Sequence, residues 1–335
     1  MIPEGEQPAL EQKKINILKV ALAISITLTI IKFIAYLLTN SNAILTDAAE
    51  SLVNIVAGGF ALYSVILSAK PRDREHPYGH GKIEFLSAGA EGFMITAAGV
   101  FIIGKSIYGL FSPTELSRLD IGIILTAFAG IANFIVGQLL IIKGKKWKSL
   151  PLIADGKHLR SDAITSAGLI IGLIVILITD IFWIDNIIAI LFGFILIYSG
   201  YGILRKSVGG VMDEADVELI HEVITILNSN RIKDWIDFHN LRIIKYGSNL
   251  HIDAHITLAY YWDLQRVHEE LDKIEELINY KMGTKVELFI HPDPCVPKSC
   301  RICRKNDCPV RQHPFTTEVI WNLENVMQNE KHKLD

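Results

Sequence analysis

The sequence has few cysteines, no surplus of basic residues and no signal-peptide core. All four cysteines lie between Cys295 and Cys308, and this clustering argues for metal binding rather than a disulfide framework. The 33 Lys and Arg residues are balanced by 36 Asp and Glu, which argues against a nucleic-acid partner. Residues 1–14 are polar and lack the apolar stretch that a signal peptide needs.

Apolar residues make up 50% of the chain. They form long blocks up to about Ser207 and alternate with charged residues beyond it. A membrane-spanning helix needs about 20 mostly apolar residues. Six stretches meet this length and are predicted to span a membrane: Ile15–Leu38, Ala43–Leu67, Phe85–Leu110, Ile121–Ile142, Leu152–Ile178 and Ile181–Leu204.

Basic residues in the connections indicate how the spans are oriented, because Lys and Arg accumulate on the cytoplasmic side. The connections at 40–42, 112–120 and 180–185 hold only Arg118 among them. The opposite ends of the spans are rich in basic residues: Lys13, Lys14, Lys70, Arg72, Arg74, Lys82, Lys143, Lys145, Lys146, Lys148, Arg205 and Lys206. We therefore expect a multi-pass protein of the cell membrane with both termini in the cytoplasm.

The part after Met212 predicts a small cytosolic α+β unit, since helical spacing alternates there with strand-like alternation. Two helices on one face of a small sheet would bury a modest core. The predicted elements are helices Ala215–Asn228 and Leu264–Lys281, strands Leu241–Tyr246, Leu250–Leu258 and Lys285–Ile290, a turn at Gly247-Ser248-Asn249, and a terminal helix at Thr317–Met327. The chain is thus divided into a cytosolic tail (1–14), a six-helix transmembrane domain (15–207), a cytosolic metal-binding domain (208–294) and a cysteine-rich segment with the terminal helix (295–335).

The second and fifth predicted spans begin with the same pattern of polar residues. Positions i, i+3 and i+7 are polar in both, so each triplet lies along one helix face. An ionisable residue within a span costs roughly 2.5–3.5 kcal/mol, and it therefore usually has a partner or a function. The two triplets are Asp47, Glu50 and Asn54, and Asp155, His158 and Asp162.

If the two faces meet, Glu50, Asn54, His158 and Asp162 form a cage of one imidazole, two carboxylates and one amide. Such a mixed nitrogen and oxygen set suits Zn²⁺, and also Fe²⁺, Co²⁺, Ni²⁺ or Mn²⁺. The alternative is plain hydrogen bonding between helices. Asp47 and Asp155 are accessory candidates. Each is expected one turn nearer the external end, where it would orient ligands, cap its helix or line the exit.

The chain resembles the cation diffusion facilitator family of metal exporters over roughly residues 15–295. The resemblance rests on the His158-x-x-x-Asp162 pair, its counterpart in the second span, and three segments: Pro71–Lys82, Ser207–Glu214 and His291–Cys295. It implies six spans, a cytosolic ferredoxin-like αββαβ domain, a homodimer, and metal-for-proton exchange by alternating access. The family's zinc transporters usually have Asp or His followed by Asp in the second span. Glu50 and Asn54 depart from that pattern, so Zn²⁺ is the leading candidate among several metals.

The resemblance also implies metal sites outside the membrane. A second, shallower family site matches Asp73, His76 and His80, and Glu75 lies close enough in sequence to join it. The family's cytosolic binuclear site maps onto His239, His255, His268, His291 and Asp293. His251 is an extra candidate, because it shares a strand face with His255. These sites are expected to clamp the dimer and to sense cytosolic metal.

The cysteine cluster has a spacing that suits a tetrahedral thiolate site, because its central pair is separated by two residues. We expect a structural Zn²⁺ there; the alternatives are an iron–sulfur cluster or a metal-capturing arm. The ligands would be Cys295, Cys300, Cys303 and Cys308, with His313 following them.

The expected function is therefore divalent metal efflux in exchange for protons, with membrane lipid, metal ions, protons and a second copy of the chain as partners. A membrane metalloenzyme is one alternative, since His76-x-x-x-His80 resembles a histidine box. The other boxes are missing, and so is the His-Glu-x-x-His motif of zinc proteases. A metal receptor without transport is the other alternative, but it would leave the polar triplets in the spans without a purpose.

Overall fold

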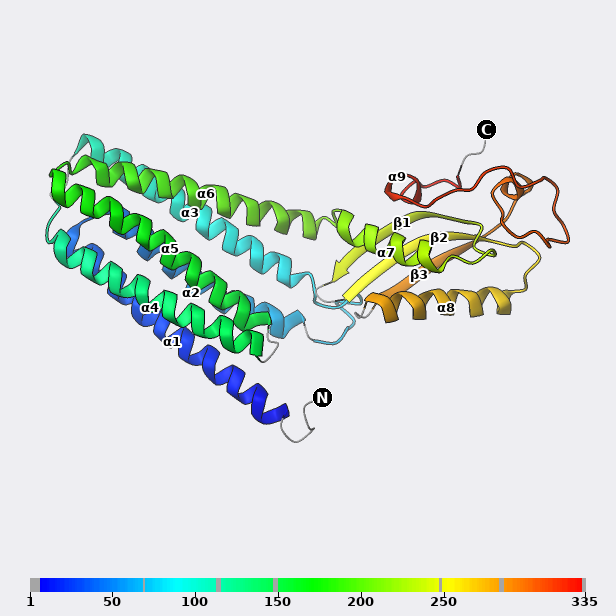
Figure 1. The fold of residues 1–335 in the computed structure, drawn as a ribbon, viewed down its shortest axis with the longest axis horizontal. Coiled ribbons are helices and arrows are strands. Elements are labelled where there is room, and N and C mark those ends of the chain that lie inside the picture. The colour runs from blue at the N-terminus through cyan, green and yellow to red at the C-terminus, as the bar shows by residue number, and fades with distance from the viewer. Residues whose placement is uncertain are drawn as a thin grey trace. The chain divides into compact units, whose positions relative to one another are not determined.

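The fold is described by a computed structural model that covers residues 7–68, 70–112, 116–146, 150–246, 249–282 and 286–332. The chain divides into two compact units (Figure 1). One unit contains residues 1–62 and 87–206, and the other contains residues 63–86 and 207–335. The helix-connecting loop around residues 70–82 therefore groups with the C-terminal part of the chain.

Among the described residues, six helices are long and apolar enough to cross a membrane, as the sequence predicts. The first five extend beyond the predicted spans at both ends, and the first begins inside the predicted tail of residues 1–14. The sixth begins two residues later than predicted and extends beyond its span at the C-terminal end. Their bounds are α1 Gln7–Thr39, α2 Asn42–Ser68, α3 Ile83–Phe111, α4 Leu119–Lys146, α5 Leu150–Thr179 and α6 Trp183–Val211.

Glycines let these helices approach each other closely. A Cβ atom on Gly137 of α4 would lie 2.7 Å from the carbonyl oxygen of Gly156 on α5. A Cβ on Gly92 of α3 would lie 2.8 Å from the carbonyl oxygen of Gly200 on α6. Small residues at helix contacts are typical of membrane bundles, because helices in lipid associate through close packing rather than through the hydrophobic effect.

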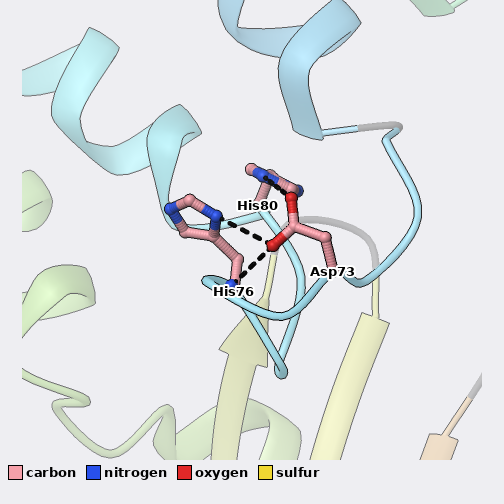
Figure 2. A group of neighbouring side chains, drawn as sticks. All are labelled: Asp73, His76 and His80. Atoms are coloured by element: carbon pink, nitrogen blue, oxygen red, sulfur yellow. Dashed lines mark hydrogen bonds and ion pairs between the residues drawn. The ribbon is translucent and has the colours of Figure 1, made fainter.

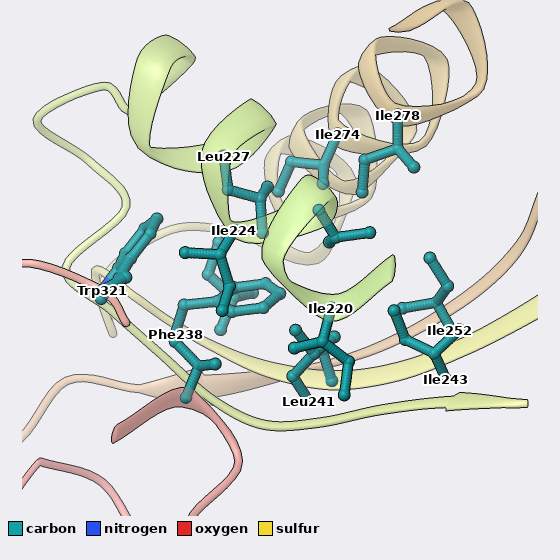
Figure 3. Close-up of a cluster of buried hydrophobic side chains, with 14 of the residues drawn as sticks. Ile220, Ile224, Leu227, Phe238, Leu241, Ile243, Ile252, Ile274, Ile278 and Trp321 are labelled. Atoms are coloured by element: carbon teal, nitrogen blue, oxygen red, sulfur yellow. The ribbon is translucent and has the colours of Figure 1, made fainter. Parts of the chain in front are cut away.

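The soluble part has the predicted αββαβ order: α7 Val217–Asn230, β1 Asp237–Tyr246, β2 Asn249–Leu258, α8 Leu264–Met282 and β3 Val286–Pro294. The sheet order is β1-β2-β3, with β1 and β2 antiparallel and β2 and β3 parallel. Both helices pack on one face of the sheet. Apolar side chains from α7, α8 and the strands fill the space between them (Figure 3). The opposite face of the sheet is thereby left for polar side chains.

The soluble part differs from the prediction in three places. β1 begins at Asp237 and β3 ends at Pro294, so both strands extend past their predicted bounds, Leu241 and Ile290. The predicted terminal helix Thr317–Met327 is wrong in most of its length, since only Leu323–Val326 is helical. Val319 and Trp321 instead alternate into the core from an extended segment, and Asn322 caps the short helix. Gly247, Ser248 and Lys285 lie outside the described residues.

Candidate metal sites

A cavity of about 400 Å³ lies within the helix bundle. Its lining comes from residues 18–29 in the middle of α1, residues 51–62 in the middle and second half of α2, residues 155–162 near the start of α5, and Asn133 of α4. Asn54, Asp155, His158 and Asp162 are part of this lining. Three of the four residues of the predicted cage therefore share one cavity.

The polar groups of this cavity lie within reach of one another but are not tightly bonded. His158 Nε2 lies 3.8 Å from Asp162 Oδ2. The amide nitrogen of Asn54 is buried and has no hydrogen-bond partner among the described residues. Glu50 is half-buried one turn away on α2 and does not line the cavity, although its charge interacts with that of Asp162.

The two accessory candidates occupy different places. Asp155 lines the cavity near the start of α5. The expectation that it lies toward the same end of the bundle as Asp47 is wrong. Two helices, α3 and α4, lie between α2 and α5 in the chain. Because consecutive spans alternate in direction, α2 and α5 run in opposite directions, and their first residues lie on opposite sides of the membrane. Asp47 sits beyond the cage, away from the cavity's lining.

Asp47 is bound by a lysine that the sequence analysis did not single out. Lys32 of α1 is 1% exposed, and its ammonium lies 2.9 Å from Asp47 Oδ1. It also donates to Ser51 Oγ at 2.9 Å, and Ser166 of α5 donates to Asp47 Oδ1 at 3.0 Å. A lysine well inside a long apolar span is the sequence signal that points to such a partner.

The loop between α2 and α3 brings Asp73, His76 and His80 together (Figure 2). His76 Nδ1 lies 3.2 Å and His80 Nε2 lies 3.5 Å from the two carboxylate oxygens of Asp73. The backbone N–H of His76 donates to Asp73 at 2.7 Å, and this bond holds the pKa of Asp73 below its usual value. Glu75 contributes its backbone N–H to the same carboxylate and is not part of the cluster.

Three of the contacts that hold this loop reach the sheet and the segment that follows α6. Arg72 donates through both guanidinium nitrogens to the Glu287 carboxylate on β3. Tyr78 stacks on Tyr246 of β1 with ring centroids 5.6 Å apart. Lys82 pairs with Asp213 at 2.9 Å. The loop cluster is thus held in place from the soluble part of the chain.

A row of three histidines crosses the sheet on the face away from α7 and α8. His239 of β1 pairs with His255 of β2, and His255 pairs with His291 of β3. A bulge between His239 and Arg242, with Asn240 at a φ of 55°, sets this register. A left-handed φ is tolerated better by Asn than by most residues.

Asp293 contacts all three histidines of the row. Its Oδ2 lies 3.2 Å from His255 Nδ1 and 3.4 Å from His239 Nε2. Its Oδ1 lies 3.8 Å from His291 Nε2. His239, His255 and Asp293 offer ligand atoms that all lie within 4.8 Å of one another. A carboxylate that faces different histidines with its two oxygens has the form of a bridging ligand.

The far end of the chain supports this row. His332 donates its backbone N–H to Asp237 Oδ2 at 3.0 Å, and its Nδ1 contacts the other oxygen. Asp237 in turn lies 3.5 Å from His239 Nδ1. Burial opposes the charge of Asp237, but the bonds from His332 outweigh it and hold the pKa of Asp237 below its usual value. Burial lowers the pKa of His239. No pattern in the sequence points to His332, because its contact with Asp237 joins segments that are far apart in the chain.

The other two cytosolic candidates lie apart from the row. His268 is on α8, which covers the opposite face of the sheet, and it pairs with Asp272 at 3.7 Å. His251 lies further along β2 between two carboxylates, 3.1 Å from Asp253 and 3.6 Å from Glu287. One chain alone therefore does not bring His268 to the other four predicted residues.

The four cysteines surround a cavity of about 40 Å³. Arg311 organises the loop around them by donating to the carbonyl oxygens of Cys300, Cys303, Lys305 and His313. The backbone N–H of Gln312 donates to Cys300 Sγ at 3.5 Å. Burial raises the pKa values of Cys295 and Cys303. All four cysteines therefore line one cavity, and thiolates are the ligands that Zn²⁺ binds in structural sites.

A bundle of six long apolar helices with a His–carboxylate cavity, followed by a soluble domain with a His–Asp row, defines a multi-pass cation transporter. Residues 18–211 match the cation efflux transmembrane domain, and residues 215–295 match the cytoplasmic domain of cation efflux proteins. The chain therefore belongs to the cation efflux, or cation diffusion facilitator, family, and its C-terminal domain is cytoplasmic. This is a family of transporters, not of enzymes.

Characterised and uncharacterised relatives cover most of the chain. It is 33% identical over 263 residues to the uncharacterized transporter sll1263 of Synechocystis, covering 78% of this chain and 85% of the relative. It is 30% identical over 293 residues to the cation-efflux pump FieF of Salmonella paratyphi A and of Salmonella agona, covering 84% of this chain and 93% of each relative. The cysteine-rich tail lies beyond the matched cytoplasmic domain.

Proposed function

We propose that the chain exports a divalent metal ion from the cytoplasm in exchange for protons, with Zn²⁺ as the first candidate and Fe²⁺, Mn²⁺, Co²⁺, Ni²⁺ and Cd²⁺ as the others. The observation that carries the proposal is the cavity shared by Asn54, His158 and Asp162 in the middle of the helix bundle. Because the C-terminal domain is cytoplasmic, the helix ends around this cavity face the cytoplasm. An ion would therefore enter from that side.

Exchange follows from the chemistry of the ligands. Metal binds the deprotonated forms of His and carboxylate groups, so binding releases protons and protonation releases metal. His158 and Asp162 are the proposed proton-sensitive pair, since both offer ligand atoms that a proton and a metal ion can occupy only in turn. Glu50 completes the cage when the helices close around the ion.

The test is metal uptake into sealed proteoliposomes driven by a pH gradient, with each of the six metals in turn. We expect uptake that depends on the gradient and is lost in the variant His158→Ala with Asp162→Ala. Absence of flux with every metal would leave a metal receptor without transport as the better description. Flux that survives the double substitution would overturn the assigned site.

The cytoplasmic sites are proposed to regulate and stabilise this transport. His239, His255, His291 and Asp293 would bind metal in each chain, and the loop cluster Asp73, His76 and His80 would bind a further ion. The family to which the domain belongs supports assembly as a homodimer in the cell membrane, where His268 of one chain would be free to complete a site.

The cysteine cluster is proposed to hold one structural Zn²⁺. Its support is the convergence of Cys295, Cys300, Cys303 and Cys308 on one small cavity. Metal analysis of the purified chain tests it: we expect one tightly held zinc per chain that is lost in Cys300→Ser with Cys303→Ser. An iron content with visible absorption would indicate an iron–sulfur cluster instead.

A further inference from the structure

Lys32 is a buried cation next to the transport cavity, although it contributes no ligand to it. Its ammonium is shared between Asp47 and Ser51, both at 2.9 Å. A buried ammonium is costly unless it is paired and hydrogen-bonded. Such a residue is retained in a span where its charge has a partner or a function.

The position of Lys32 connects it to the metal cage in two ways. Ser51, which accepts its hydrogen bond, also lines the cavity. In addition, the lysine charge acts on both cage carboxylates, Glu50 and Asp162. Lys32 therefore lies directly behind the wall that the ion would contact.

The same group fixes the two helices that carry the ligands. Asp47 of α2 accepts from Lys32 of α1 and from Ser166 of α5 through a single oxygen, Oδ1. Its other oxygen is buried without a hydrogen-bond partner among the described residues. Asp47 is thus held as the counter-ion of Lys32 and is kept out of the cavity.

Lys32 reduces the negative charge of the three carboxylates on which it acts, which are Asp47, Glu50 and Asp162. With these groups deprotonated they supply three negative charges. Lys32 offsets one of them, and two remain for a divalent cation. Asp155 adds a further carboxylate to the cavity lining, outside the group that Lys32 contacts.

We propose that Lys32 is a positioning residue that sets the charge of the transport site, with Asp47 as its fixed counter-ion. The inference rests on the proposed transport function and goes beyond it, because neither residue is a metal ligand. In this role the ammonium of Lys32 lowers the affinity of the transport site for the metal ion, so that the ion can be released.

The variants Lys32→Met and Asp47→Asn separate charge from structure. Lys32→Met leaves a third uncompensated negative charge, so the KM for metal should fall by about tenfold and the maximal rate should fall with it. Asp47→Asn leaves the ammonium unpaired, so the KM should rise by about tenfold. The double variant restores the net charge and should return the KM to within about threefold of the unaltered chain.

The experiment is metal flux in proteoliposomes for all four proteins, with thermal unfolding measured in parallel. A purely structural role predicts the opposite, because the double variant loses every bond in the group and would be at least as impaired as either single variant. That result, or failure of the double variant to fold, overturns the inference. If Lys32→Met does not fold alone, recovery in the double variant still supports it. If the unaltered chain shows no flux, the transport proposal itself fails, and this outcome is distinct from the others.

Discussion

The transmembrane cavity and the cytoplasmic histidine row use the same ligand chemistry at different spacings. In the row, His239, His255 and Asp293 offer atoms within 4.8 Å of one another. In the cavity, the groups line a space of about 400 Å³, and Asn54 lacks a partner for its amide among the described residues. The row is preorganised for binding, and preorganisation lowers the cost of holding a ligand.

The difference follows from the elements that carry the ligands. Strand register fixes the row, since neighbouring strands in one sheet cannot move apart without breaking their ladder. The cavity depends on helices that are held by close packing and can shift against each other. A site that must release its ion to the other side of the membrane is served by the second arrangement, and a regulatory site by the first.

The largest expected effect is that of Asp162→Asn. It removes the charge of a proposed ligand in the buried cavity, and breaking such a buried set typically costs about 3–5 kcal/mol, more than about 100-fold in binding. We expect flux to be lost while metal binding at the histidine row is unchanged. The measurements are uptake into proteoliposomes and metal stoichiometry of the purified chain.

The matched control is Asp180→Asn, beyond the end of the same helix at Thr179. Its φ of 56° suits Asn as well as Asp, so flux should remain normal. Equal losses of flux in both variants would break the distinction between the cavity and the rest of α5.

Substituting His239 should have the opposite effect to Asp162→Asn: the cytoplasmic site should lose affinity for metal, while flux through the membrane is kept. His239→Ala removes a buried ligand of the row, and we expect the affinity of the cytoplasmic site to fall by at least about tenfold. Flux at saturating metal should persist, because the cavity is intact. Isothermal titration in the Asp162→Asn background isolates the cytoplasmic site. His221→Ala, an exposed histidine on α7, is the control. Loss of flux in His239→Ala would contradict the separation of the two sites.

The sequence predicted most of the fold because its main signals are local. Long apolar blocks identified six helices, and period-two alternation identified β2 almost to the residue. The repeated triplets also identified Asn54, His158 and Asp162, because an ionisable residue in a span needs a reason. The expectation that Asp155 lies toward the external side of the membrane was wrong, because two helices that begin with similar sequences can run in opposite directions.

The rest depends on contacts between distant segments. Lys32 is one of two lysines in the first predicted span, with Lys19, and only the packing of α1 against Asp47 distinguishes it. His332 lies far from His239 in sequence and reaches it through Asp237. The terminal helix failed because Val319 and Trp321 are drawn into the core, and that tertiary contact outweighs a weak helical preference.

His332→Ala tests the support of the histidine row with a smaller expected effect. A carboxylate behind a ligating imidazole fixes its orientation, and loss of such support costs about 10–100-fold in affinity. We expect the lower end, about tenfold, because Asp237 stays in place when His332 is removed. The measurement is metal titration in the Asp162→Asn background.

His332→Asn is the graded variant, since its amide can still donate to Asp237. We expect its affinity to lie between those of the unaltered chain and His332→Ala. An affinity equal to that of the unaltered chain in both variants would mean that the tail does not support the row.

The smallest expected effect concerns the scaffold alone. Asp216 caps α7 by accepting from the Leu219 N–H at 3.1 Å, and loss of such a cap costs about 1 kcal/mol. The bond from Lys245 holds the pKa of Asp216 below its usual value. Because the pKa of Asp216 is lower in the folded than in the unfolded state, its charge stabilises the fold at pH values above the unfolded-state pKa, about 4. This stability is lost as the pH falls through the folded-state pKa. Asp216→Ala should therefore increase the rate of hydrogen exchange in α7 at neutral pH. As the solution is acidified, the exchange rates of the variant and of the unaltered chain should become more alike. Asp216→Asn keeps the cap and should change exchange far less at neutral pH.

Metal affinity of the row should be the same in all three proteins, because α7 packs on the opposite face of the sheet and the strand ladder, not the helix cap, sets the spacing of the ligands. A fall in affinity with Asp216→Ala would show that the row takes its preorganisation from the whole domain.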